Sequence, residues 1–310
     1  MRSVILLMLA GTLFITPVLV YSQQKNISPL KGPYCGQTPP GMTPKIFAPG
    51  FISTDDGELN SVFTKNGSEF YFSRRNIPGK PSAIMVTRMV NGTWSVPQLV
   101  NFSGKKDDVD LFITPDGMSM IFCSEGDKPP GPVSYPDHDF RISHRTGEKW
   151  SDPIPFAKEA ASAFEDYYPV VTASGNLYFN SQRSGPGTND IYCSKYINHR
   201  YTKPVKMPET INTEYREFDA FLTQDEQMII YSSDRPGGYG WSDLYVSWKK
   251  ADGTWSAPRN LGETINSEYS EYGASLTPDG KYLFFTSTRN GSEDIYWVSA
   301  KVIEAVRLKK

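Results

Sequence analysis

The chain has 310 residues and a formal net charge of −2, from 32 basic and 34 acidic side chains. A nucleic-acid-binding protein needs a basic face that displaces counterions, so this balance argues against a nucleic-acid partner. The 18 Tyr, 17 Phe and 6 Trp residues favour a strand-rich structure. A chain of this length forms either one large repeat domain or two ordinary domains.

The first residues have the pattern of a signal peptide. Arg2 gives a positive start, residues 4–20 are mostly apolar, and the run ends in polar and small residues near Ser22. A membrane anchor is the alternative, but the apolar run is short for a membrane span. We therefore expect a signal peptide at residues 1–22, an N-terminal extension at 23–41, no membrane span after signal cleavage, and a periplasmic or secreted protein.

One short pattern, Thr-x-x-Gly-x-x-hydrophobic-x-aromatic, recurs along the chain. Its copies start at Thr64, Thr114, Thr172, Thr223 and Thr277. A Gly-containing turn between two strand-like runs is typical of a hairpin. A varied loop, a third strand-like run such as DLYVSW, and a tight turn before a fourth run such as DGTWSAP come next. One repeat therefore predicts four antiparallel strands, the unit of a propeller blade.

The repeats predict an all-β fold: a five-bladed β-propeller over residues 42–304, with a C-terminal tail at 305–310. The fifth repeat lacks its fourth strand, while residues 42–56 resemble the segment that follows this strand elsewhere. We therefore expect the N-terminal segment to complete the last blade and close the ring, which removes exposed sheet edges. An open solenoid of sheets is the alternative.

The run TPDG-x-x-hydrophobic-x-aromatic-x-Ser with a later Asp-Ile-Tyr resembles the PD40 repeat, a WD40-like unit of TolB-like propellers. The resemblance covers residues 42 to 300, and the opening GQTPPGMTPKIFAPGFIS is similar to exported propellers of Bacteroidota. It implies the propeller fold. PD40 propellers include periplasmic scaffold proteins, peptidase-associated domains and oligogalacturonate lyases, so the resemblance leaves several functions open.

The strand order separates the connections onto two faces of the ring. The turns from first to second strand and from third to fourth strand are short, and they share one face. The loops from second to third strand and the connections between blades are longer and more varied, and they share the other face. Binding residues concentrate on variable loops of a rigid frame, so we expect a site on this second face, near the central channel.

An acidic residue stands six positions before each repeat Thr: Glu58, Asp108, Asp166, Glu217 and Glu271. Its regularity predicts a structural carboxylate. Two residues later the side chain varies among Asn60, Asp110, Tyr168, Asp219 and Gly273, and the strand period of two puts it on the same side. A site specialised on one axis needs such variation. Asp110, Tyr168 and Asp219 are therefore candidate site residues.

Three repeats have an Arg after the second strand and an Asp before the third: Arg183 with Asp190, Arg235 with Asp243, and Arg289 with Asp294. We expect each pair to clip its blade. The first repeat has Arg74 and Arg75 but Ala83 in place of the Asp. A guanidinium without its usual partner suits a carboxylate or sulfate ligand. Pairing of Arg75 with a neighbouring blade is the alternative.

Two loops on the same face carry further candidates. His138 lies in a Pro- and Gly-rich segment, residues 126–139, and its imidazole suits proton transfer near neutral pH; a solvated polar residue is the alternative. Tyr239 and Trp241 lie in the loop GGYGW, where core packing does not explain them. We expect no cofactor, although the acidic residues 107, 108 and 110 leave a divalent metal open.

The leading hypothesis is a lyase or dehydratase that acts by β-elimination on uronic-acid oligosaccharides during polysaccharide degradation. It assigns charge stabilisation to Arg75 and proton transfer to His138 and Tyr168. The expected substrate-binding residues are Arg74, Asp110, Arg183, Asp219, Arg235, Tyr239 and Trp241. The alternative is a non-catalytic TolB-like propeller that binds a glycan or a protein, and a hydrolase with Asp110 and Asp219 as its carboxylates is a third possibility. We expect an acidic oligosaccharide as ligand and a monomeric protein.

Overall fold

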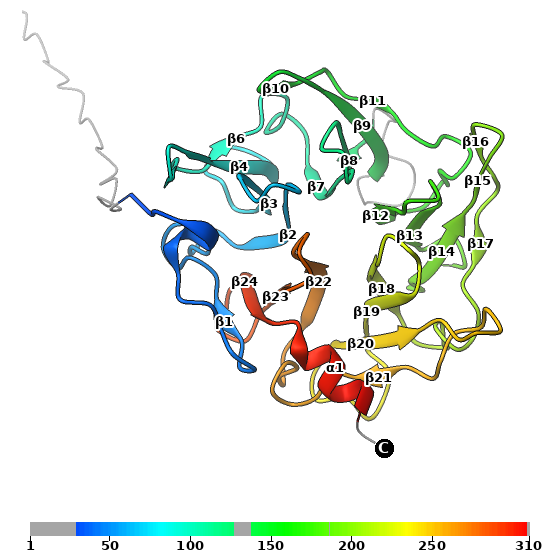
Figure 1. Cartoon of the computed structure of the whole chain (residues 1–310). Helices are drawn as coiled ribbons and strands as arrows, with labels where there is room; N and C mark the ends of the chain where they lie inside the picture. Colours follow the sequence, from blue (N-terminus) through cyan, green and yellow to red (C-terminus); the bar gives the residue numbers. More distant parts are fainter. Residues whose placement is uncertain (1–28, 127–137, 186, 309–310) are drawn as a thin grey trace, which may run out of the picture.

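The computed structural model describes residues 29–126, 138–185 and 187–308. These residues form the five antiparallel sheets of the blades around a central axis, as Figure 1 shows, and a separate two-stranded ribbon at an outer turn. The prediction of an all-β, five-bladed propeller with four-stranded blades is confirmed. The signal peptide predicted at residues 1–22 lies outside the described residues. In the ranges described, no helix is long and apolar enough to cross a membrane.

The strands of each blade follow the chain from the axis outwards (Figure 1). Blade 1 consists of β2 (Glu58–Phe63), β3 (Glu69–Arg74), β4 (Ala83–Val90) and β6 (Gln98–Leu99). Blade 2 consists of β7 (Asp108–Ile113), β8 (Ser119–Glu125), β9 (His138–Thr146) and β11 (Ile154–Pro155). Blade 3 consists of β12 (Asp166–Val171), β13 (Leu177–Ser181), β14 (Asp190–Ser194) and β17 (Val205–Lys206). Blade 4 consists of β18 (Glu217–Leu222), β19 (Met228–Ser233), β20 (Asp243–Trp248) and β21 (Arg259–Asn260). Short strands at the outer turns are β5 (Thr93–Trp94), β10 (Lys149–Trp150), β15 (Tyr196–Ile197) and β16 (Arg200–Tyr201).

Blade 5 takes strands from both ends of the described chain. It consists of β22 (Glu271–Leu276), β23 (Tyr282–Ser287), β24 (Asp294–Ser299) and β1 (Lys45–Ile46), which pairs antiparallel with β24. Phe47 follows β1 and is fully buried, with its ring 5.0 Å from those of Phe70 in blade 1 and Phe284 in blade 5. That this N-terminal segment is what closes the ring stays a prediction.

The core consists of apolar side chains packed between neighbouring blades. Phe122 lies in the cluster between blades 1 and 2, Phe179 between blades 2 and 3, and Tyr231 between blades 3 and 4, all fully buried. Each fully buried aromatic side chain of this kind contributes about 1.5–3 kcal/mol of transfer free energy. The frame that carries the loops is therefore rigid.

Every innermost strand contains a β-bulge near its start, which the sequence analysis did not foresee. The register shifts at the same place in β2, β7, β12, β18 and β22. The residue two positions after the repeated acid has positive φ in all five: Asn60 (45°), Asp110 (53°), Tyr168 (54°), Asp219 (51°) and Gly273 (62°). Asn, Asp and Gly tolerate this left-handed region. The variation at this position therefore has a backbone cause as well as any functional one.

The repeated acid is structural, and it binds the Arg that was expected to pair elsewhere. Arg235 donates to Glu217 at 3.1 Å and to the carbonyl of Ile211 at 3.0 Å, which ties the connection between blades to the inner strand. Arg183 and Arg289 make the same contacts with Asp166 and Glu271. The predicted pairs with Asp190, Asp243 and Asp294 are wrong, because the carboxylate at the start of the inner strand lies within reach of the same guanidinium.

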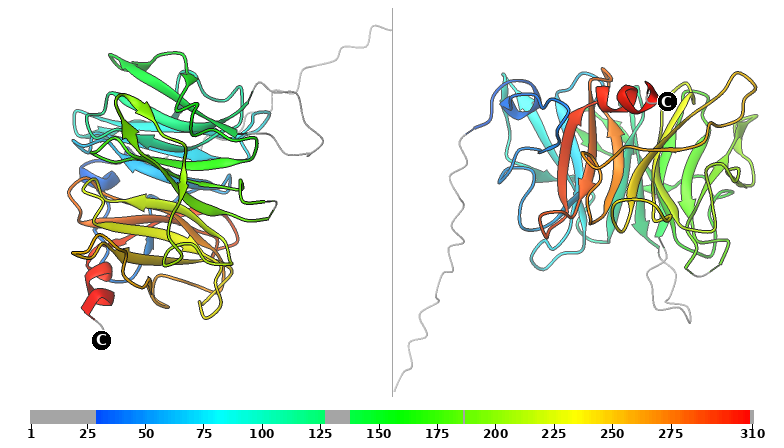
Figure 2. Two further views of the ribbon diagram at one scale, coloured as in Figure 1. Left: turned by 90° about the vertical axis from the view of Figure 1, so that its right-hand side faces the viewer. Right: turned by 90° about the horizontal axis from the view of Figure 1, so that it is seen from below.

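The two terminal segments pack against the propeller. Residues 33–36 form the 3₁₀ helix η1 (Pro33–Gly36), and the Trp94 indole N–H donates to the carbonyl of Gly32 at 2.7 Å. After β24 the chain forms α1 (Lys301–Leu308), whose Val302, Ile303 and Val306 are buried against blades 4 and 5. The domain boundary predicted at residue 304 falls inside this helix. Figure 2 shows α1 on one face of the ring.

Candidate functional site

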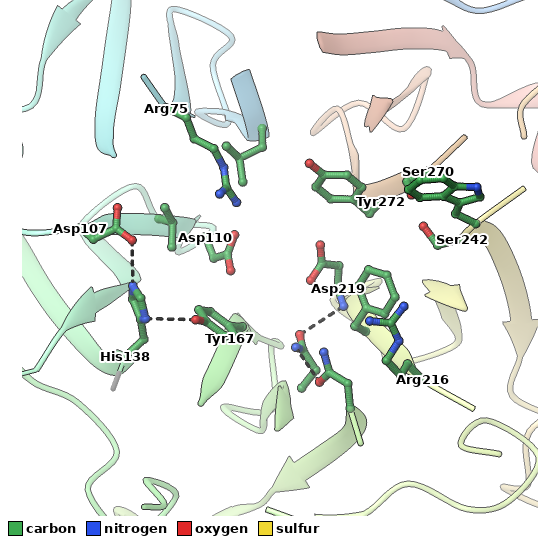
Figure 3. Close-up of a pocket in the computed structure, with 16 residues that line it drawn as sticks. Arg75, Asp107, Asp110, His138, Tyr167, Arg216, Asp219, Ser242, Ser270 and Tyr272 are labelled. Carbon is green, nitrogen blue, oxygen red and sulfur yellow. Dashed lines mark hydrogen bonds and ion pairs between the residues drawn. The ribbon is translucent and has the colours of Figure 1, made fainter. Parts of the chain in front are cut away.

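A pocket of about 400 Å³ opens at the central axis, on the face opposite α1. Its lining comes from the starts of the inner strands, the loops between second and third strands, and the connections between blades, which is the face expected to carry a site. The lining residues are Leu59, Arg75, Asp107, Val109, Asp110, His138, Tyr167, Asn180, Asn189, Arg216, Phe218, Asp219, Trp241, Ser242, Ser270 and Tyr272. Figure 3 shows how their side chains converge.

All five blades contribute the residue that follows the repeated acid to the wall of the pocket. These residues are Leu59, Val109, Tyr167, Phe218 and Tyr272. The repeated acids themselves do not line the pocket. The expectation that the acid and the residue two positions after it lie on the same side of the strand is therefore wrong. The bulge breaks the strand period of two. Asp110 and Asp219, which have the left-handed conformation at the bulge, point into the pocket, while the repeated acid stays buried in the blade.

Asp110, which is buried, and Asp219, which is partly exposed, have carboxyl groups that face one another across the pocket (Figure 3). Burial raises the pKa of Asp110 to about 6, against the opposing charges of Arg75 and His138. Burial and then the negative charge of Asp110 raise the pKa of Asp219 well above its usual range. Near neutral pH the pair therefore prefers to hold one proton between its two groups, as like charges at one site do.

A hydrogen-bonded chain of three side chains lies beside Asp110. The Tyr167 hydroxyl is 3.1 Å from His138 Nδ1, and His138 Nε2 is 3.1 Å from the Asp107 carboxylate. Burial and the nearby charge of Glu165 raise the pKa of Tyr167, so this phenol is neutral and donates to the imidazole. Although burial opposes it, hydrogen bonds from His138 and Ser82 lower the pKa of Asp107, which stays ionised beside the imidazole. The chain can therefore move a proton to or from the phenol oxygen.

Two guanidinium groups flank the pocket, and each is bound by a carboxylate. Arg75 of blade 1 lies 3.0 Å from Glu293, which belongs to blade 5 and also accepts the hydroxyl of Tyr272. Pairing of Arg75 with a neighbouring blade is thus what the structure contains. The Arg75 side chain is nevertheless 47% exposed, so it remains open to the pocket. Arg216 of blade 4, which is 54% exposed, pairs with Asp234 at 2.7 Å.

Five of the residues proposed from sequence line the pocket together: Arg75, Asp110, His138, Asp219 and Trp241. His138 is not in a solvated loop, since it begins β9 and is 96% buried. The other proposed residues do not line this pocket: Arg74, Tyr168, Arg183, Arg235 and Tyr239.

The contacts of these residues explain why they do not line the pocket. The Tyr168 hydroxyl donates to the carbonyl of Ala274 at 2.8 Å within the core, which excludes it from proton transfer in the pocket. Arg74 binds Glu58 and so occupies the structural role that Arg183 and Arg235 have in their blades. The Tyr239 side chain is half exposed and is not among the side chains that line the pocket.

The sequence patterns did not single out Asp107, Tyr167, Arg216 or Tyr272 as catalytic or substrate-binding residues, although Asp107 was considered for a metal. All four directly precede or follow a repeated acid, so the repeat alignment contains the signal. The residues before the acid are Gly57, Asp107, Glu165, Arg216 and Ser270, and they differ in every blade as a ring of site residues would. Within the described ranges, no group of three or more His, Cys, Asp or Glu side chains is arranged to hold a metal ion.

Comparisons with known proteins concern the fold. No protein-family model and no curated protein matches the chain. The TolB protein of Acinetobacter baumannii is similar in structure, with 14% identity over 78% of this chain and 54% of that chain and a TM-score of 0.47. A protein of unknown function from Dyadobacter fermentans is 12% identical over 84% of this chain and 83% of that one, with a TM-score of 0.48. An oligogalacturonate lyase in complex with manganese is 17% identical over 78% of this chain and 65% of that one, with a TM-score of 0.42. The chain spans about half the length of the TolB protein that it matches.

Proposed function

We propose that this protein is an exported carbohydrate-active enzyme, a lyase or dehydratase that acts by β-elimination on uronic-acid-containing oligosaccharides. The observation that carries the proposal is the convergence of three groups on one pocket: a guanidinium, a carboxyl pair that shares a proton, and a phenol on a hydrogen-bonded chain. Elimination from a uronate needs one group of each kind.

Arg75 binds the uronate carboxylate. Proton removal at C5 pushes negative charge onto this carboxylate, and a fixed cation stabilises the charge as it develops. Glu293 holds the guanidinium in place from the neighbouring blade, and the half-exposed side chain leaves donors for a ligand. A planar guanidinium with two N–H groups directed at one carboxylate also orients the sugar ring.

Asp110 removes the C5 proton, and Tyr167 protonates the leaving oxygen. A base works best with a pKa near the working pH, and Asp110 has a pKa of about 6. The C5–H electron pair becomes the C4=C5 double bond, and the C4–O bond breaks with its electron pair on oxygen. That oxygen takes the Tyr167 proton, so one proton enters the enzyme at Asp110 and one leaves at Tyr167.

His138 and Asp107 act through Tyr167, not on the sugar. Both ring nitrogens of His138 are engaged, one by Tyr167 and one by Asp107, so the imidazole orients the phenol. After each turnover the Tyr167 phenolate takes a proton from water and Asp110 releases its proton to water, which restores the starting state. We therefore assign His138 as a positioning residue, in place of the direct role that the sequence suggested.

A second function has an observation in its favour. Asp110 and Asp219 are two carboxyl groups that face one another across a pocket, and a glycoside hydrolase also uses two carboxyl groups in this way. Hydrolysis releases a reducing end without forming a double bond, so the two reactions give different products.

The test is to incubate the purified protein with uronic-acid oligosaccharides and follow the ultraviolet absorbance of the unsaturated uronate together with new reducing ends. Rising absorbance that is lost in Tyr167→Phe supports elimination. New reducing ends without absorbance support the hydrolase. Binding without either product means a non-catalytic glycan-binding propeller, and no binding overturns the carbohydrate assignment.

A further inference from the structure

Trp241 presents an almost bare indole at the mouth of the pocket. It lies in the loop between β19 and β20, lines the pocket, and is 78% exposed. Two other exposed aromatic residues are its neighbours. Tyr239 precedes it by two residues and is 49% exposed. Tyr269, whose backbone carbonyl accepts the backbone N–H of Trp241, is 42% exposed. A large apolar ring held in water is unfavourable, so its retention beside a polar pocket points to a ligand.

The loop that carries Trp241 is fixed from within blade 4. The Asp243 carboxylate accepts the backbone N–H of Tyr239 at 2.7 Å and of Gly240 at 3.1 Å. Asn260 donates to the same carboxylate at 2.6 Å. The aspartate that sequence analysis expected to bind an Arg instead holds the backbone just before Trp241.

Blade 5 fixes the same loop from the other side. The Trp241 N–H donates to the carbonyl of Tyr269 at 2.9 Å, and Ser242 bridges to Ser270 in parallel. The backbones approach so closely at Gly240 that a Cβ there would lie 2.2 Å from the carbonyl oxygens of Ser267 and Tyr269. Only glycine fits at this position. The indole therefore stands on a loop that two blades hold.

We propose that Trp241 forms a second sugar subsite, which takes the pyranose ring next to the acidic residue bound in the pocket. The apolar C–H face of a pyranose stacks on an indole, while the polar groups of the pocket bind the charged residue. The inference rests on the proposed function for the identity of the sugar in the pocket. It adds that the ligand is an oligosaccharide, which runs from the axis over the rim between blades 4 and 5.

The test measures binding by calorimetry, independently of turnover, for a uronate monosaccharide and for uronic-acid oligosaccharides. Trp241→Ala raises the Kd for the oligosaccharides about tenfold, the size expected for one aromatic stacking contact, and leaves the Kd for the monosaccharide unchanged. Trp241→Phe, which keeps a ring, recovers part of the loss. Tyr196→Ala is the matched control, since Tyr196 is 41% exposed on the opposite face.

The outcomes separate the subsite from the reaction. If the wild type binds oligosaccharides without turnover and Trp241→Ala selectively weakens the binding of oligosaccharides, the result supports the subsite and contradicts β-elimination. If Trp241→Ala binds oligosaccharides as the wild type does, or weakens monosaccharide and oligosaccharides equally, the subsite is overturned whatever the enzyme does. Binding of no sugar by the wild type overturns both proposals.

Discussion

The buried Asp110 carboxyl makes the protein less stable at neutral pH than it would be without this group. Burial raises the pKa of Asp110 from 3.8 to about 6. The folded state therefore keeps a proton that the unfolded chain releases above about pH 4, so the free energy of unfolding falls as the pH rises from about 4 to about 6. The difference in pKa corresponds to about 3 kcal/mol, present in full above about pH 7.

Asp110→Asn removes this cost without disturbing the backbone. Asn60 has the equivalent place in blade 1, with φ of 45°, so asparagine fits the left-handed position that Asp110 occupies at 53°. The variant has a higher free energy of unfolding at about pH 7.5, by up to about 3 kcal/mol, and nearly the wild-type value at about pH 4. The pKa of Asp219 falls as well, because a negative neighbour is gone.

Urea unfolding at the two pH values measures the effect, and Asp116→Asn is the matched control. Asp116 is exposed on the opposite face, and a hydrogen bond from Thr114 lowers its pKa, so its loss slightly reduces stability at neutral pH. A gain for Asp110→Asn that is equal at both pH values refutes the electrostatic reasoning. A loss of stability at about pH 7.5 refutes it as well.

Three further results follow from the contacts described. Arg235→Met removes the cation beside the fully buried Glu217, which keeps only neutral hydrogen bonds from Thr213 and Ser233, and lowers the free energy of unfolding by about 3–5 kcal/mol. Arg75→Ala changes the free energy of unfolding by under about 1 kcal/mol, because Arg75 is half exposed. Equal effects of the two variants in urea melts contradict the structural assignment. Tyr167→Phe abolishes turnover and keeps the melting temperature. Tyr168→Phe keeps turnover and lowers the free energy of unfolding by about 1 kcal/mol. The reverse pattern contradicts the proposed site. Removal of β1 exposes the edge of β24 and causes aggregation in light scattering, and an unchanged soluble monomer contradicts ring closure.

The fold could be predicted from the repeats because their turn and strand signals agree. The turn that follows each repeat Thr and the alternating apolar runs specify antiparallel strands, and five copies can bury their faces only against one another. The face of the pocket could be predicted from the strand order together with the length and variation of the loops. Arg75, Asp110, His138, Asp219 and Trp241 could be placed there because they break a repeat pattern or stand on a varied loop.

The remaining site residues depend on geometry that a strand pattern does not encode. A β-bulge shifts register by one residue, which brings the residue after the acid, such as Tyr167, into the wall of the pocket. Tyr168 stands at the bulge itself, but its hydroxyl binds the carbonyl of Ala274 in the core, which no strand pattern reveals. The preference for Asn, Asp and Gly at the bulge position was the one visible sign of the bulge. The partner of Arg75 could not be inferred, because Glu293 is more than two hundred residues away and meets it only when the ring forms.

The most direct test of the proposed site is the structure of the Asp110→Asn variant with a bound uronic-acid oligosaccharide, since this variant lacks the base and leaves the substrate intact. In this complex we expect the uronate carboxylate against Arg75, the leaving oxygen within hydrogen-bonding distance of the Tyr167 hydroxyl, and the next ring over Trp241. A sugar bound on another face, or one whose carboxylate lies away from Arg75 in this pocket, would contradict it.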